Sequence, residues 1–169
     1  MRLLVLGGTH HVGRAVVEAA LARGHEVTTL TRGLSGPPAA GAHARHADRA
    51  SARAVAAVLA GAEWDAVIDT WSGPPRAVQD TAGILAGRAG HYCYVSSRSV
   101  YQWPVPPYAD ESAPVVGGDP ASQDDEDYAA AKRGGEMAVT AAFGDRALIA
   151  RAGLILGPYE ITGRVPWWQ

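Results

Sequence analysis

The sequence predicts an α/β fold in which helices cover both faces of a parallel β-sheet. Short runs of β-branched or aliphatic residues alternate along the chain with alanine-rich stretches of helical length, which is typical of right-handed βαβ units. A glycine-rich turn at residues 7–13 also joins the first expected strand directly to a helix. Neither a repeat nor a linker divides the 169 residues, so we expect one domain, residues 1–169.

The first half of the chain is expected to contain three strands and two helices. Strands are predicted at residues 3–6, 26–31 and 42–46. One helix is predicted over residues 12–23 and closed by Gly24, because glycine readily adopts the left-handed conformation that ends helices. A second helix is expected after Ser51, which can cap its first turn, and before Gly61.

The second half is expected to repeat this alternation. Strands are predicted at residues 65–70, 91–96 and 146–151. Pro74 and Pro75 are expected to open a helix, where a missing amide hydrogen costs nothing. A proline-rich loop follows over residues 102–123. Ser122 and Asp125 have the spacing of a capping box, which predicts a helix from there to about Phe143.

Composition narrows the class of protein. The formal net charge of −2 predicts no surface for nucleic acid. Cys93 is the only cysteine, which excludes an internal disulfide and favours a reducing compartment. We find neither a signal peptide nor an apolar run of the roughly 18 residues that a membrane span requires. A cytoplasmic protein without a membrane partner is therefore expected.

The glycine-rich turn is a candidate dinucleotide site. Gly7 can supply the tight turn and Gly13 can let the helix pack closely on the sheet, so that free amides face a pyrophosphate. His10 stands where a glycine is usual. An ordinary tight βα connection remains an alternative. His10 and His11 are either loop residues or phosphate contacts, and no metal site is expected because adjacent histidines rarely point at one ion.

The end of the second strand bears on the choice of cofactor. NAD-specific sites place a carboxylate there to bind the ribose 2′-hydroxyl. Thr31 holds this position and Arg32 follows it. An arginine can bind a 2′-phosphate, so NADP is favoured and NAD is the alternative. A solvated surface arginine is the competing explanation.

Tyr128 and Lys132 form a candidate catalytic pair. They lie four residues apart, on one face of the predicted helix, and Lys132 is the only lysine in the sequence. A phenol needs its pKa lowered by about three units, or about 4 kcal/mol, to act as a base near neutral pH. A cation about 5 Å away supplies roughly 3 kcal/mol at an effective dielectric constant near 20. Ser96, Ser97 and Ser99 come at the end of a predicted strand, and one of their hydroxyls could orient a substrate carbonyl nearby, although serines in such loops are common.

Taken together, the chain resembles the extended short-chain dehydrogenase/reductase family, particularly its epimerase/dehydratase-like members. Five segments carry the resemblance, namely residues 7–13, 95–101, 110–114, 128–132 and 151–158. The resemblance implies a Rossmann-type doubly wound sheet with strand order 3-2-1-4-5-6. It also implies that the family's C-terminal substrate region is largely absent, and the terminal Trp167 and Trp168 have no expected element to pack on.

The resemblance assigns roles to particular residues. Ser97 would be the catalytic serine, Tyr128 the acid/base and Lys132 the group that binds the cofactor ribose. Asp48 and Arg49 resemble a pair near the adenine, while Thr70 and Trp71 match a cofactor-facing strand end. The expected cofactor contacts are Gly7, Thr9, His10, His11, Val12, Gly13, Arg32, Asp48, Arg49, Thr70, Trp71 and Lys132.

The implied activity is NAD(P)-dependent oxidoreduction or epimerisation, with hydride transfer at a carbinol carbon of a small-molecule substrate. Two alternatives remain open. One is a non-catalytic NADP-binding regulator, although such proteins usually lose the tyrosine and lysine. The other is an RNA-binding Rossmann protein, because a subgroup with a Gly-Gly-Thr-Arg-Phe turn resembles chloroplast stem-loop-binding proteins. The mildly acidic net charge argues against RNA. A homodimer is left open.

Overall fold

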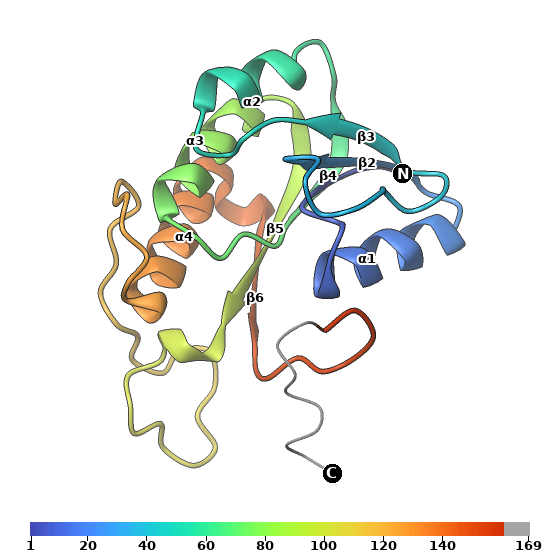
Figure 1. Cartoon of the computed structure of the whole chain (residues 1–169). Coiled ribbons are helices and arrows are strands. Elements are labelled where there is room, and N and C mark those ends of the chain that lie inside the picture. Colours follow the sequence, from blue (N-terminus) through green and yellow to red (C-terminus); the bar gives the residue numbers. More distant parts are fainter. Residues whose placement is uncertain (161–169) are drawn as a thin grey trace.

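The sheet has six parallel strands in the order β3-β2-β1-β4-β5-β6 (Figure 1), which confirms the expected topology. A computed structural model describes residues 1–160, so Trp167 and Trp168 lie outside the described residues. The strands are β1 (Arg2–Leu6), β2 (Glu26–Thr31), β3 (His43–His46), β4 (Trp64–Asp69), β5 (Ala89–Ser97) and β6 (Ala147–Ala152). The helices are α1 (His11–Ala22), α2 (Ala52–Val58), α3 (Pro75–Leu85) and α4 (Tyr128–Phe143), with short 3₁₀ turns η1 (Arg98–Val100) and η2 (Gly144–Arg146).

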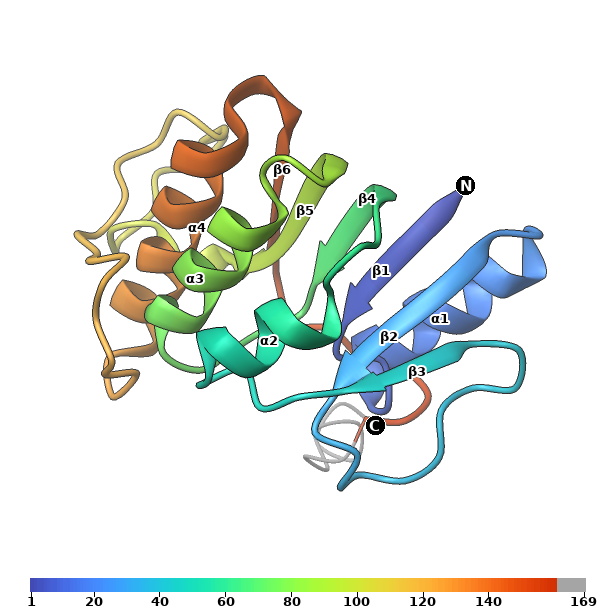
Figure 2. The same cartoon turned by 90° about the horizontal axis from the view of Figure 1, so that it is seen from above.

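The two faces of the sheet carry different helices. In Figure 2, α1 lies on one side of the sheet and α2, α3 and α4 lie on the other. Alternate side chains of β1 separate the two cores, because successive residues of a strand point to opposite faces. Leu3 and Val5 pack in the cluster with Val17 of α1. Leu4 and Leu6 pack in the larger cluster beneath the other three helices.

Three residues cap, end or begin helices as the sequence predicted. Ser51 caps α2 by accepting a hydrogen bond from the amide of Ala54 at 3.3 Å. Gly24 follows α1 with φ of +75°, the left-handed conformation that ends many helices. Pro75 is the first residue of α3. Ser51 and Pro75 therefore mark where two loops at the carboxyl edge of the sheet end in helices, and Gly24 marks the return of the chain to the amino edge, where β2 starts.

The predicted start of α4 is wrong. The helix begins at Tyr128, and Asp127 caps it by accepting a hydrogen bond from the amide of Ala130 at 3.0 Å. The Ser122 hydroxyl instead accepts from the amide of Asp124 at 3.0 Å, in a turn of its own. Short polar side chains bind nearby amides in turns as readily as at helix starts, so the spacing alone did not distinguish the two. Tyr128 consequently occupies the first helical residue.

The strand order places a crevice beside β1. The chain leaves β1 toward α1 on one face of the sheet, and it leaves β4 toward α3 on the other. Loops that diverge in this way leave a ligand-binding opening beyond the carboxyl ends of the strands. The glycine-rich turn and residues 70–74 therefore border the same opening. Within residues 1–160, no helix is both long and apolar enough to span a membrane.

Candidate functional site

The glycine-rich turn lies close against the end of β4. Gly7 has φ of +113°, and a Cβ at this position would stand 2.4 Å from the Thr70 hydroxyl oxygen. A Cβ at Gly13 would stand 2.7 Å from the amide nitrogen of Gly8. Thr70 is itself fixed, because its hydroxyl donates to the carbonyl of Leu6 at 3.0 Å. Gly7 therefore lets the turn lie against the Thr70 side chain, and Gly13 lets the first turn of α1 approach the backbone of Gly8.

The two histidines of the turn differ in their surroundings. His10 is exposed and stands at the N-cap of α1, and its side chain makes no capping hydrogen bond. His11 begins the helix with φ of +41°, which is unusual for a residue with a side chain. Its Nε2 atom is buried and has no hydrogen-bond partner among the described residues. A strained residue with an unsatisfied nitrogen is typical of a position where a bound ligand supplies the missing hydrogen bond.

A cavity of about 310 Å³, here called the central cavity, brings together both halves of the expected site. From the glycine-rich turn and β4 its lining includes His11, Val12 and Thr70. From β5 and α4 it includes Ser97, Tyr128 and Lys132. The structure thus places the candidate catalytic trio opposite the glycine-rich turn.

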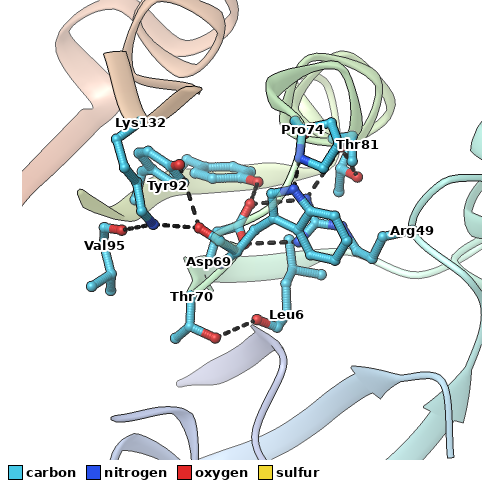
Figure 3. Close-up of polar contacts among 12 residues, drawn as sticks. Leu6, Arg49, Asp69, Thr70, Pro74, Thr81, Tyr92, Val95 and Lys132 are labelled. Carbon is cyan, nitrogen blue, oxygen red and sulfur yellow. Dashed lines mark hydrogen bonds and ion pairs between the residues drawn. The ribbon is translucent and has the colours of Figure 1, made fainter. Parts of the chain in front are cut away.

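Lys132 is held inside the wall of the central cavity. Its ammonium donates to the carbonyl of Val95 at 2.9 Å and to the carbonyl of Trp71 (Figure 3). The nitrogen lies 4.9 Å from the ring centre of Tyr94 and 5.9 Å from that of Tyr128. Burial lowers the pKa of Lys132 to about 8, although the charge of Asp69 opposes the shift. An ammonium with three protons and two carbonyl acceptors keeps one proton for another partner.

Tyr128 and Ser97 line the central cavity from different elements. Tyr128 is 46% exposed, so its phenol is accessible from solvent. Ser97 ends β5, and its hydroxyl oxygen accepts from the amide of Ser99 at 3.1 Å. The neighbouring Ser96 instead donates to the buried carboxylate of Glu136 at 2.7 Å. The Ser96 hydroxyl is therefore used in a buried hydrogen bond, whereas the Ser97 hydroxyl contacts only Ser99 in the adjoining turn.

Glu136 organises this wall, although it was not among the residues expected at the site. It lies one helical turn beyond Lys132 and is 1% exposed. Both of its oxygens accept from the guanidinium of Arg151 at 2.9 Å, and Arg133 donates to it at 3.0 Å. These hydrogen bonds lower the pKa of Glu136, although burial acts to raise it. The carboxylate thereby ties α4 to the ends of β5 and β6.

A second cavity of about 180 Å³ adjoins the first and is here called the β2 cavity. Its lining includes Gly7, Thr9 and Arg32, together with the end of β4 at Thr70 and Trp71. Thr70 lines both cavities, so the two meet at the glycine-rich turn. Most of the residues expected to contact a cofactor therefore border one continuous edge of the sheet.

Arg49 lines the β2 cavity but is not free to turn into it. Its guanidinium donates two hydrogen bonds to the carboxylate of Asp69, at 2.8 and 2.9 Å, and a third to the carbonyl of Ala77 (Figure 3). Tyr92 donates to the same carboxylate at 2.7 Å. Burial acts to raise the pKa of Asp69, but the charge and hydrogen bonds of Arg49 outweigh it and lower that pKa. The Arg49 Nε atom has no partner within residues 1–160.

Three of the expected cofactor contacts lie outside these linings. Asp48 is exposed, and its carboxylate accepts from the amide of Ala50 at 2.9 Å. His10 lines neither cavity, and Gly13 is buried beneath the turn. The structure consequently brings together Ser97, Tyr128, Lys132 and Thr70, but it does not bring Asp48 to the same wall.

The fold and site define a Rossmann-type protein with a tyrosine, a lysine and a serine at the carboxyl edge of its sheet. Residues 3–168 match the sequence profile of the NAD dependent epimerase/dehydratase family. The chain belongs to this family, as the resemblance implied. No curated protein sequence matches the chain significantly.

Solved structures agree with the fold. The Bordetella bronchiseptica enzyme WbmH, in complex with NAD+, is 16% identical with a TM-score of 0.80, and the match covers 99% of this chain and 60% of that one. WbmG from the same organism, in complex with NAD and UDP, is 18% identical with a TM-score of 0.77, covering 99% and 58%. A UDP-glucose 4-epimerase from Thermotoga maritima, with UDP-glucose, is 16% identical with a TM-score of 0.76, covering 95% and 58%. The chain thus spans less than two thirds of the length of these structures.

A nicotinamide dinucleotide fits the residues of the two cavities. Gly7 and Gly13 let the turn fold tightly against Thr70 and Gly8, and this turn contributes residues to both cavities. The orphaned Nε2 of His11 is positioned in a wall that such a ligand would contact. The carboxyl edge of the sheet offers hydrogen-bond donors and the cations Arg32 and Lys132, which suits an anionic ligand with several hydroxyl groups.

Proposed function

We propose that this chain forms the cofactor-binding and catalytic part of an NADP-dependent oxidoreductase or epimerase that acts at a carbinol carbon. The observation that carries the proposal is the central cavity. Its walls combine His11, Val12 and Thr70 on one side with Ser97, Tyr128 and Lys132 on the other. Family membership supports the same chemistry.

In the proposed reaction Tyr128 moves the proton. In its ionised form the exposed Tyr128 side chain can take the hydroxyl proton of a substrate alcohol as the carbinol carbon is oxidised, and the phenol so formed can return that proton when the carbonyl is reduced. The Ser97 hydroxyl would donate a hydrogen bond to the same substrate oxygen and so hold it in place. In both directions these two side chains bind one oxygen atom, which fixes the position of the reacting carbon.

Lys132 would bind the cofactor ribose and favour the ionised phenol. Its ammonium has one proton left after its two carbonyl contacts, and that proton is available for a ribose hydroxyl. A nicotinamide dinucleotide, when bound, supplies the hydride acceptor or donor. The residues proposed to hold it are Gly7, Thr9, His11, Val12, Gly13, Arg32, Thr70, Trp71 and Lys132. His10, Asp48 and Arg49 would act at its periphery.

NADP is proposed over NAD because Arg32 follows the end of β2, where an NAD-specific site would hold a carboxylate. Arg32 is exposed and lines the β2 cavity. The substrate is proposed to be a small-molecule alcohol of the nucleotide-sugar class, since one similar structure was solved with UDP and another with UDP-glucose. A cytoplasmic location and a homodimer remain predictions.

Isothermal titration with NADP+ tests the binding part of this proposal. Wild type should bind the cofactor, and Tyr128→Phe should bind it equally well because the phenol acts on the substrate. Lys132→Met should bind it about tenfold more weakly or worse, since a hydrogen bond from a charged group contributes about 1.5–3 kcal/mol. Absence of cofactor binding by wild type would overturn the proposal.

Incubation of NADP+ with UDP-sugars tests the chemistry, with near-ultraviolet absorbance reporting net reduction of the cofactor and NMR of the sugars reporting epimerisation. Wild type should give one of these two products with at least one sugar of the panel, and Tyr128→Phe should give neither. If the variant that binds cofactor normally also turned over normally, Tyr128 would not be the acid/base.

A further inference from the structure

Two neighbouring residues of β5 are bonded to two residues of α4 that lie one helical turn apart. The Lys132 ammonium donates to the carbonyl of Val95 at 2.9 Å (Figure 3). The Ser96 hydroxyl donates to the carboxylate of Glu136 at 2.7 Å. Ser97, the next residue of the strand, lines the central cavity. The two contacts therefore hold α4 beside β5 just before the candidate catalytic serine.

The chain after Ser97 is held to the same carboxylate through Arg151. The Arg151 guanidinium donates to both oxygens of Glu136, each at 2.9 Å. Its carbon atom lies 4.9 Å from the ring centre of Tyr101. Tyr101 directly follows the η1 turn, which begins at the residue after Ser97. Glu136 consequently holds the chain on both sides of Ser97, through Ser96 before it and through Arg151 after it.

Glu136 lies in the interior, one turn beyond the residues of α4 that line the central cavity. Tyr128, Lys132 and Glu136 follow one another at intervals of four residues, so they share one side of the helix. The first two line the central cavity, whereas Glu136 is 1% exposed and is not among the described residues that line it. Because Glu136 does not border the cavity, it can act on a bound substrate only through the residues that it holds.

We propose that Glu136 is a positioning residue that sets the distance between Ser97 and Tyr128 and so controls the rate of turnover. The inference rests on the proposed function, in which these two side chains bind one substrate oxygen. Ser97 belongs to β5 and Tyr128 to α4, so they can share an atom only while the two elements keep a fixed separation. A displacement of about 1 Å in such a site can reduce the rate about 100-fold.

Ser96→Ala tests this inference with little disturbance, because Glu136 keeps its hydrogen bonds to Arg151 and Arg133. Titration calorimetry should show NADP+ affinity within about twofold of wild type. In the assay with UDP-sugars, kcat should fall about 10- to 100-fold, because the serine and the tyrosine no longer meet the same oxygen. A change in stability alone would not separate kcat from cofactor affinity in this way.

Thr81→Val is the matched control. Thr81 is also buried, and its hydroxyl donates at 2.7 Å to the carbonyl of Ala77 within α3. It is not among the described residues that line either cavity. The variant loses one buried hydrogen bond, as Ser96→Ala does, and should keep the kcat of wild type. An equal fall of kcat in both variants would mean that lost stability, and not position, explains the result.

A double variant tests whether Ser96 acts through Glu136. Glu136→Gln should also lower kcat at nearly unchanged NADP+ affinity, and adding Ser96→Ala to it should lower kcat no further, since both changes break one contact. If Glu136→Gln does not fold, the comparison of Ser96→Ala with Thr81→Val still decides the matter.

The outcomes separate this inference from the function on which it rests. Normal kcat in Ser96→Ala, or losses that multiply in the double variant, would overturn the positioning role while leaving the proposed function intact. Failure of wild type to bind NADP+ or to convert any sugar of the panel would overturn the proposed function and this inference together.

Discussion

Arg49 and Asp69 form a two-point ion pair in the interior, with N–O distances of 2.8 and 2.9 Å. The two residues are 5% and 0% exposed. The pair joins the loop between β3 and α2 to the end of β4, and the Arg49 guanidinium carbon lies 5.0 Å from a ring centre of Trp71. It therefore supports the loop whose Trp71 carbonyl holds Lys132.

Breaking this ion pair should strongly destabilise the protein. Arg49→Met leaves the Asp69 carboxylate buried without its countercharge, which costs about 3–5 kcal/mol. The double variant Arg49→Met with Asp69→Leu should lose less free energy of unfolding than Arg49→Met and Asp69→Leu lose in sum, since it buries no unpaired charge. Urea denaturation measures the free energy of unfolding of all three variants. A loss below about 1 kcal/mol in the single variants would show that the pair is not buried as described.

The ammonium of Lys132 should titrate near pH 8 rather than at its ordinary 10.5. Between these values the unfolded chain binds more protons than the folded one, so the contribution of Lys132 to the free energy of unfolding rises with pH across this window. Because Lys132 is the only lysine, selective ¹³C-lysine labelling yields one side-chain NMR signal to follow. A midpoint close to 10.5 would mean that the side chain is solvated.

Gly7→Ala should impair both stability and cofactor binding. Alanine is strained at φ of +113°, and its Cβ would press on the Thr70 hydroxyl, so a loss of about 1–3 kcal/mol in unfolding free energy is expected. NADP+ affinity should fall as well, because Thr70 lines both cavities. Gly36→Ala is the matched control, with φ of +99° and open space around the Cβ. Thermal denaturation and calorimetry should show normal cofactor affinity in that control. Similar affinities in both variants would argue against the turn as the binding element.

The N-terminus of α4 should depend on Asp127 and not on Ser122. Asp127→Ala removes the side chain that accepts from Ala130, at a cost of about 1 kcal/mol. Ser122→Ala removes only a turn contact to Asp124 and should cost less than about 0.5 kcal/mol. Urea denaturation of the two variants, compared in one experiment, decides the boundary. The reverse order of effects would restore a helix that starts near Ser122.

The local part of the site could be predicted from the sequence. Tyr128 and Lys132 are four residues apart on one helix, so their shared face follows from helix geometry. Gly7 and Gly13 could be identified because a tight βα turn needs glycine at such positions. The alternation of strands and helices likewise predicted the parallel sheet, and its strand order followed from the family resemblance.

The long-range part could not be predicted in this way. Asp69 comes from β4 and Arg49 from the loop between β3 and α2, and only tertiary packing decides that they pair. Glu136 bonds to Arg151 across α4 and β6 for the same reason. The sequence did indicate that Asp69 and Glu136 need partners, since both acids interrupt otherwise apolar or small-residue stretches that pack in the core. Buried acids are usually paired with a cation, so a pairing could be expected for each, but the sequence did not identify the arginine.

The most direct test of the site is the ¹³C signal of Lys132 during titration with NADP+. Lys132 lines the central cavity together with residues of the glycine-rich turn, so bound cofactor should shift this signal in wild type, and Gly7→Ala should need a higher NADP+ concentration for the same shift. A signal that stays unchanged when calorimetry shows the cofactor site to be saturated would contradict the placement of Lys132 at the cofactor.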